Sequence, residues 1–219
     1  MKGLRINSGS HGKWERLLRV MSEGDKIALA MENCAGKTDQ EVVKLALKDG
    51  NYFECLIERY EAKIKRYVMR ICSVDSDTAE DISQEVFVKV FYHLNDYDGG
   101  FSFSVWIYRI AHNMAIDFIR KNGRFFESIT NYGEDGKICN LILSDEDLPE
   151  NYQKQELVEM VRKSLYSLPE KYRDVLVLRY LEDKSYEEIG DILRKSVNSV
   201  SILLSRGKKL MKDRLKFKL

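Results

Sequence analysis

The residues from Arg194 to the C-terminus are strongly basic. This stretch has nine lysines and arginines and a single acid, Asp213, which gives it a net charge of +8. The serines Ser199, Ser201 and Ser205 lie at its beginning. Such a charge suits binding of nucleic-acid phosphates through neutralisation and release of counterions. The alternative is a solvated basic tail, but the charge lies where a helix-turn-helix needs it, and this favours contact with DNA.

A second group combines aromatic rings with cations around a Gly-Gly turn. Unstacked bases of single-stranded DNA lie on aromatic rings while cations hold the backbone, so this composition suits a single strand. The alternative is that half of the rings are core residues, Trp106 in part. The members of the group are Tyr97, Phe101, Phe103, Trp106, Tyr108, Arg109, Arg120, Lys121 and Arg124.

A third group is acidic and lies at the expected start of a helix. Asp77, Glu80 and Asp81 are explained by the helix dipole, which favours negative charge at the first turn. Glu85 lies one turn further in and is less well explained in this way. Since acids gain nothing by facing DNA, this group indicates a basic protein partner.

The chain lacks a catalytic or metal-binding pattern. It contains no phosphate-loop, dinucleotide-binding or H-E-x-x-H motif. The cysteines, Cys34, Cys55, Cys72 and Cys139, form no C-x-x-C pair, and the three histidines do not cluster with them. We therefore expect no enzyme activity, no metal and no cofactor, and we expect reduced thiols that lie partly in the core.

The composition favours a helical protein in the cytoplasm. Among 219 residues there are 13 glycines and only 2 prolines, and a chain so poor in helix breakers is usually helical. No apolar run reaches the roughly 18 residues of a membrane span. The first ten residues lack the apolar core of a signal peptide. We expect a cytoplasmic, all-α protein without membrane insertion.

Apolar periodicity predicts a first helical domain over residues 38–124. Helices are expected at 39–48, 53–71, 78–94 and 104–121, with Thr78 and Asp81 in a capping arrangement. Residues 1–37 form an N-terminal extension of unknown role. Residues 125–153 are expected to be an acidic, flexible linker, since positions 127–150 have a net charge of −6.

A second helical domain is predicted over residues 154–219. Periodicity returns at 157–168, and Pro169 suits the first turn of the next helix. Ser185 and Glu188 form a capping box. A short turn at 194–196 leads to a long last helix, and this order matches a helix-turn-helix.

Four segments, in this order, resemble the extracytoplasmic-function (ECF) group of bacterial sigma factors in the sigma-70 family. The resemblance covers about residues 38–219 and implies a region 2 bundle and a region 4 helix-turn-helix. The segments are AEDISQEVF at 79–87, FSVWIYRIAHNMAID at 103–117, LPEKYR at 168–173 and SYEEIG at 185–190.

The resemblance implies a factor that binds core RNA polymerase, recognises the −10 and −35 promoter elements and promotes DNA opening. It also allows for an anti-sigma factor as a partner. It implies polymerase contact by Asp81, Gln84 and Glu85. For the −10 element it implies Tyr97, Phe101, Phe103, Trp106, Arg109, His112, Asn113 and Arg120. For the −35 element it implies Ser199, Ser201, Leu204, Ser205, Arg206, Lys208 and Lys209.

The sequence departs from the family in the last motif. The turn has Arg194 near the position where the family usually has glycine, and Ser201 and Leu203 stand near positions that are usually cationic. The alternative function is a stand-alone, two-domain helix-turn-helix regulator that binds duplex DNA without polymerase. The acidic helix start and the aromatic loop favour the sigma factor, because such a regulator needs neither.

Overall fold

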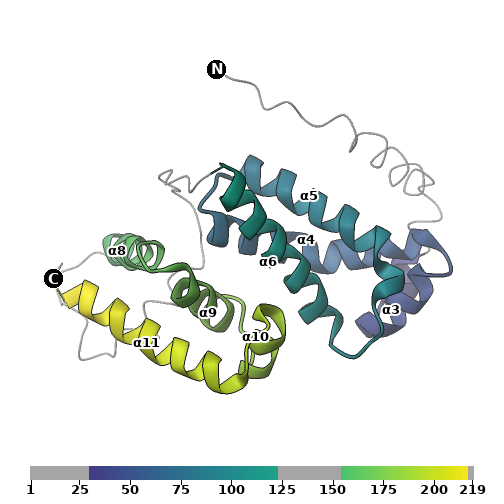
Figure 1. The fold of residues 1–219 in the computed structure, drawn as a ribbon. Coiled ribbons are helices and arrows are strands. Elements are labelled where there is room, and N and C mark those ends of the chain that lie inside the picture. Colours follow the sequence, from purple (N-terminus) through teal and green to yellow (C-terminus); the bar gives the residue numbers. More distant parts are fainter. Residues whose placement is uncertain (1–29, 123–153, 217–219) are drawn as a thin grey trace.

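The computed structural model describes residues 30–122 and 154–216, all of whose regular elements are helices. The predicted all-α fold with two helical domains is confirmed. The N-terminal helices are α3 (Asp39–Ala46), η1 (Gly50–Tyr52), α4 (Phe53–Cys72), α5 (Ser76–Tyr92), η2 (Leu94–Asp96) and α6 (Phe103–Asn122). The C-terminal helices are α8 (Lys154–Tyr166), α9 (Glu170–Tyr180), α10 (Tyr186–Leu193) and α11 (Val197–Lys216) (Figure 1).

Helix α4 is the centre of the N-terminal bundle. Its apolar residues recur every three or four positions, as the sequence predicted, and therefore lie on one face of the helix. This face packs against both α5 and α6. Its buried members include Phe53, Leu56, Tyr60, Ile64, Tyr67, Val68 and Ile71. The helix ends at Ser73, which adopts a left-handed conformation with φ of 57°.

Two helix starts differ from their predicted positions, and a third is as predicted. Helix α5 is capped by Asp75 rather than Thr78: Oδ1 of Asp75 accepts a hydrogen bond from the Thr78 amide at 2.8 Å. Pro169 is the N-cap of α9 and therefore precedes its first turn. The capping box of Ser185 and Glu188 at α10 is confirmed, with both reciprocal hydrogen bonds present.

Residues 30–37 pack on α4, although the sequence assigned them to a separate extension. Residues 30–34 are helical. A disulfide joins Cys34 to Cys55 of α4. The Arg59 guanidinium donates to the Cys34 carbonyl at 2.9 Å and to Asp39 at 2.7 Å. The N-terminal bundle therefore begins by residue 30. Residues 1–29 and the predicted acidic linker at 125–153 lie outside the described part of the chain.

The disulfide corrects the expectation of four reduced thiols. The two cysteines form no C-x-x-C pair: they are 21 positions apart and meet because the segment before α3 folds back onto α4. Cys72 remains a free, buried thiol, and burial raises its pKa to about 12. Such a thiol is a core residue, because the reactive thiolate is strongly disfavoured there.

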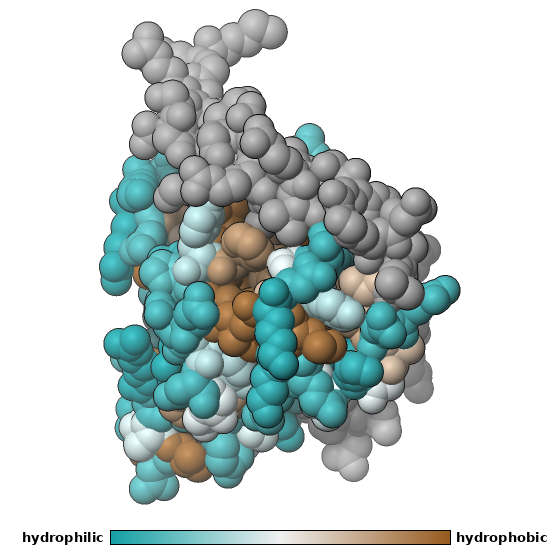
Figure 2. Space-filling model, turned by 90° about the vertical axis from the view of Figure 1, so that its right-hand side faces the viewer, coloured by the Kyte–Doolittle hydropathy of each residue, from teal (hydrophilic) through white to brown (hydrophobic). Residues whose placement is uncertain are grey.

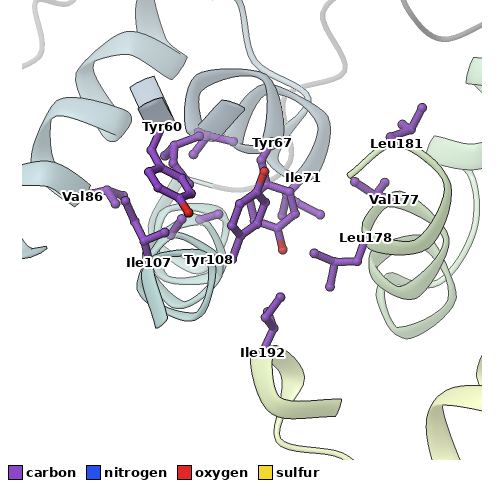
Figure 3. Close-up of a cluster of buried hydrophobic side chains, with 14 of the residues drawn as sticks. Tyr60, Tyr67, Ile71, Val86, Ile107, Tyr108, Val177, Leu178, Leu181 and Ile192 are labelled. Atoms are coloured by element: carbon purple, nitrogen blue, oxygen red, sulfur yellow. The ribbon is translucent and has the colours of Figure 1, made fainter. Parts of the chain in front are cut away.

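The N-terminal and C-terminal helices share one apolar core. Helix α10 packs along α6, and α9 packs against α4. Figure 3 shows Val177, Leu178 and Leu181 from the α9 side facing Tyr67, Ile71 and Tyr108, with Ile192 of α10 below them. The two predicted domains are therefore in direct contact, which the sequence patterns did not predict.

Within the described ranges, 30–122 and 154–216, no helix has both the length and the apolar character needed to cross a membrane.

Candidate functional site

The acidic face of α5 is open to solvent. Asp81, Gln84 and Glu85 are all exposed, and their spacing of three and four residues places them on one side of the helix. The opposite side of α5 is buried in the bundle through Ile82 and Val86. None of the three polar residues forms an ion pair with another described residue, whereas the nearby Glu80 pairs with Lys65 of α4 at 2.6 Å. The three side chains are thus available to a partner.

The loop between η2 and α6 is held by its own hydrogen bonds. The Tyr97 hydroxyl donates to the Phe101 carbonyl at 2.8 Å, and the Gly100 amide donates to Asp98 at 2.8 Å. Gly99 has φ of +77°, which glycine adopts without strain. The ring of Phe101 is 38% exposed and lies under the Arg109 guanidinium, 4.7 Å from ring centroid to Cζ. The loop therefore presents an aromatic ring next to a cation.

The rings behind this loop support it rather than extend its surface. Phe103 is only 1% exposed and packs edge-on to Tyr60, with 5.5 Å between the ring centroids. Tyr97 and Trp106 are partly buried and contact Phe103 at 5.7 and 5.8 Å. The assignment of Phe103 to DNA contact is corrected: this residue is part of the core, because the start of α6 must pack on α4.

The polar residues of α6 fall into two sets. Asn113 and Arg120 are exposed, and Arg120 is close to Asp117 at 3.5 Å on the helix surface. Arg109 and His112 instead face the C-terminal helices. Nε and Nη2 of Arg109 donate to the Asp191 carbonyl of α10 at 2.9 and 2.5 Å. The structure therefore leaves only part of the predicted −10 surface open.

His112 is neutral and enclosed. Its side chain is 12% exposed, and Nδ1 shares a hydrogen bond of 2.9 Å with the Tyr67 hydroxyl of α4. Burial, together with the charges of Arg173 and Lys195, lowers the pKa of His112 to about 4. Because the imidazole is uncharged at pH 7, the 3.9 Å approach of Nε2 to Asp174 of α9 is not an ion pair.

A tight turn connects α10 and α11. A Cβ at Gly190 would lie 2.7 Å from the Lys195 carbonyl oxygen, so only glycine allows this approach. Arg194 ends α10 in a left-handed conformation with φ of 53°, which explains why glycine suits this position in the family. Ser196 caps α11 by accepting a hydrogen bond from the Ser199 amide at 3.2 Å. This geometry confirms the predicted helix-turn-helix.

Helix α11 separates its apolar and polar residues on opposite faces. Val200, Leu204, Met211 and Leu215 are buried against α8, α9 and α10. Leu204 is 2% exposed, and its assignment to the −35 element is therefore wrong: it lies on the core side of the helix. The other residues of that assignment lie at the surface. Ser199, Ser201, Ser205, Arg206 and Lys209 are exposed, and the Lys208 ammonium lies 4.9 Å from the Tyr180 ring centroid.

The sequence analysis missed Ile202. This side chain is 51% exposed on the polar face of α11. An exposed apolar residue among polar ones on a recognition helix suits contact with a thymine methyl group in the major groove. The sequence could have identified this residue, because Ile202 falls outside the helical spacing of the apolar residues Val200, Leu204 and Met211, which are buried.

An apolar area lies elsewhere on the N-terminal bundle. Figure 2 shows apolar side chains framed by hydrophilic ones on the side of the molecule that faces right in Figure 1. Leu47 and Tyr92, 43% and 40% exposed, line a hollow between the ends of α3 and α5. No predicted binding residue lies in this hollow.

Comparisons with known proteins match both sets of helices. Residues 56–125 match the family Sigma-70 region 2, and residues 159–211 match the family Sigma-70, region 4. The ECF RNA polymerase sigma factor SigW of Bacillus subtilis is 33% identical over 171 residues, which cover 77% of this chain and 91% of that protein. The ECF RNA polymerase sigma-E factor of Escherichia coli K12 is 31% identical over 187 residues, 81% of this chain and 94% of the relative.

Solved structures share the fold. A structure of CnrH in complex with the cytosolic domain of CnrY matches with a TM-score of 0.61 at 18% identity, and it covers 84% of this chain and all of CnrH. The sigma factor RpoE of Bartonella quintana, crystallised with the anti-sigma factor NepR, matches with a TM-score of 0.57 at 20% identity, over 75% of this chain and 96% of that one.

The helix-turn-helix, the region 2 bundle and these relatives together define the class of protein. The chain belongs to the ECF sigma factors of the sigma-70 family. This membership favours the sigma-factor interpretation over a stand-alone regulator.

The environment of His112 predicts a specific loss of stability in mild acid. Its pKa is lowered from an ordinary 6.5 to about 4, so the unfolded chain binds a proton that the folded chain does not. The stabilising contribution is therefore complete above pH 6.5 and is lost as the pH falls toward 4. We expect the wild type to lose about 2 kcal/mol more than His112→Gln in free energy of unfolding between pH 7 and pH 5. Urea unfolding at both pH values measures this difference, and equal losses in the two proteins would contradict a neutral, enclosed His112.

Proposed function

We propose that this protein binds core RNA polymerase through the acidic face of α5 and directs it to promoters through the α6 and α11 surfaces. One observation carries the proposal: an exposed acidic face and a basic helix-turn-helix occur in the same chain. A protein that only binds duplex DNA gains nothing from such an acidic face. The protein would act as an initiation factor in the cytoplasm and would itself catalyse no reaction.

The −10 element is proposed to bind at the η2–α6 loop and along α6. Phe101 offers a ring on which an extruded base can stack, and the adjacent Arg109 can hold the strand. Asn113 and Arg120 extend this surface along the exposed side of α6. Tyr97 and Trp106 would hold the loop in place from below, because their rings pack on one another at 5.5 Å.

The −35 element is proposed to bind at the exposed face of α11. The residues near the start of a recognition helix reach base edges, and cations further along contact phosphates. Ser201, Ile202, Ser205 and Arg206 lie in the first half of the helix, and Lys209 follows in the second half. In this arrangement the first residues select the sequence and the later lysines add affinity that does not depend on sequence.

An anti-sigma factor is a further proposed partner. The Bartonella quintana protein was crystallised with one, and its fold matches 75% of this chain. An inhibitor of this kind would act by covering the polymerase or promoter surfaces described above.

The polymerase contact is tested by reversing the charge of the α5 face. In the variant Asp81→Lys/Glu85→Lys like charges would oppose the basic partner, so the Kd for purified bacterial core RNA polymerase should rise about 100-fold. Fluorescence titration measures the Kd, and circular dichroism checks that helix content is unchanged. The matched control is Glu58→Lys/Glu61→Lys, which makes the same change in charge at exposed positions of α4. Wild-type affinity in the α5 variant would exclude this face as the contact.

The −35 surface is tested by comparing Arg206→Ala with Lys209→Ala in the complex with polymerase. The probes are a duplex selected by the wild type from a random library and a scrambled duplex of the same composition. Loss of a base contact at Arg206 should reduce the preference for the selected duplex about tenfold or more. Loss of a phosphate contact at Lys209 should weaken both duplexes equally and lower the salt slope by roughly 0.9. If both variants lose preference to the same degree, the proposed division of α11 is wrong.

A further inference from the structure

We propose that Cys34 and Cys55 are a redox modification site that exchanges with small thiols and disulfides, and that its oxidised form holds the η2–α6 loop in place. Disulfides are rare in the cytoplasm, where we propose the protein acts, and those that form there are usually transient or redox-sensing. The bond between Cys34 and Cys55 is therefore expected to be reversible. The inference rests on the proposed function in one respect, because it takes this loop to be part of the −10 surface.

The cysteine pair lies under a short segment that can open without unfolding the bundle. Within residues 30–38 only Ala30 and Cys34 are buried, and the residues on both sides of Cys34 are exposed. Helix α3, which follows, is anchored by buried residues of its own, Val42 and Val43 among them. Because a segment with few buried apolar contacts opens locally at low cost, a small reagent can reach the sulfur atoms when residues 30–38 lift from α4.

The site accommodates both redox states. In oxidation the Cys34 thiolate attacks a disulfide reagent such as oxidised glutathione and displaces one thiol, and Cys55 then displaces the second thiol from Cys34. The pair loses two protons, and its two electrons reduce the reagent to two thiols. Reduced glutathione drives the reverse reaction. In the reduced form the Cys55 thiol keeps an acceptor while the segment is in place, because Sγ lies 3.5 Å from the Ala30 carbonyl oxygen.

Arg59 of α4 connects the disulfide to the first turn of α3. Its guanidinium donates to the Cys34 carbonyl at 2.9 Å and to Oδ1 of Asp39 at 2.7 Å. The other carboxylate oxygen of Asp39 accepts a hydrogen bond from the Tyr60 hydroxyl at 2.5 Å. When Cys34 leaves α4, Arg59 loses the carbonyl that helps to orient it, and Asp39 and Tyr60 are held less firmly.

Aromatic rings carry this connection from Tyr60 to the η2–α6 loop. The Tyr60 ring packs edge-on to Phe103, which in turn contacts Tyr97 with 5.7 Å between the ring centroids. The Tyr97 hydroxyl donates to the Phe101 carbonyl and so holds the loop. A continuous set of printed contacts therefore runs from the disulfide to the loop that presents the Phe101 ring. Oxidation would keep this loop ordered for a DNA strand, and reduction would loosen it.

The test uses the full chain with Trp14→Phe, which leaves Trp106 as its single tryptophan and as a reporter on the loop, since Trp106 packs on Tyr97. Oxidised glutathione should form the Cys34–Cys55 bond, which mass spectrometry detects. Dithiothreitol should then shift the Trp106 emission to longer wavelength, and renewed oxidation should reverse the shift. The Kd for a fluorescent single-stranded DNA of mixed sequence should rise about threefold on reduction, because a smaller fraction of the chains has the loop in place.

Three variants of this chain separate the bond from the connection to the loop. Cys34→Ser/Cys55→Ser should show the emission of the reduced chain in both buffers. Asp39→Asn keeps both cysteines and should form the bond, but its Trp106 emission should no longer respond to it, because the contacts through Arg59 are weakened. Cys139→Ser is the matched control and should respond as the parent chain does.

Two results would overturn the proposal. One is a Cys34–Cys55 pair that stays reduced in oxidised glutathione. The other is a parent chain whose Trp106 emission and DNA affinity are the same in both buffers, and this comparison needs no cysteine variant to fold. An emission that responds reversibly in a chain that binds the DNA in neither state would support the redox site and contradict the proposed function of the loop instead.

Discussion

The arrangement of the molecule depends on one buried ionic contact between its halves, that of Glu182 with Arg70 and Tyr108. Each of the three groups belongs to a different segment: Arg70 is near the end of α4, Tyr108 is in the first turns of α6, and Glu182 follows α9. Leaving Arg70 or Glu182 buried without the other would be costly, since an unpaired buried charge is strongly destabilising. The contact therefore fixes where the C-terminal helices lie on the bundle, and the apolar residues around it in Figure 3 fill the remaining space.

This position has a direct consequence for the function. The acidic face of α5 and the polar face of α11 remain open, so the contacts that we propose there with polymerase and duplex DNA do not require a change of structure. The central part of α6 is different, because Arg109 and His112 are already engaged within the chain. If α6 holds the −10 element as we propose, contact of Arg109 and His112 with DNA requires the two halves to separate. Binding of polymerase would then be linked to exposure of the DNA-binding surface through one equilibrium.

Much of the fold could be predicted from local patterns in the sequence. The apolar stripe of α4, the capping box at Ser185 and the order of helices in the helix-turn-helix depend on residues a few positions apart, and all three are present. The helix starts at Asp75 and Pro169 were displaced by one to three residues, because several neighbouring side chains could serve as caps. The exposure of Asp81 and Glu85 on α5 could also be predicted, because the apolar residues of this helix recur at helical spacing on the opposite face.

The features that were missed depend on contacts between distant segments. The Cys34–Cys55 disulfide needs the segment before α3 to fold back onto α4. The contact of Arg109 joins residues 82 positions apart, and the contacts of Glu182 join residues 74 and 112 positions apart. Phe103 and Leu204 match the family's DNA-binding segments, yet their own helices turn them toward the core. Periodicity assigns a residue to a helix face, but which face a second domain will cover is decided by tertiary packing.

The central claim is tested most directly by the distance between α6 and α11 in the free chain and in the complex with core RNA polymerase. Fluorophores attached through non-natural amino acids at the exposed positions Asp117 and Ser201 would leave the native cysteines untouched. Single-molecule energy transfer then reports whether the two halves are together. The account predicts high transfer efficiency in the free chain and low efficiency after polymerase is added. Low efficiency in the free chain, or the same high efficiency in the complex, would contradict it.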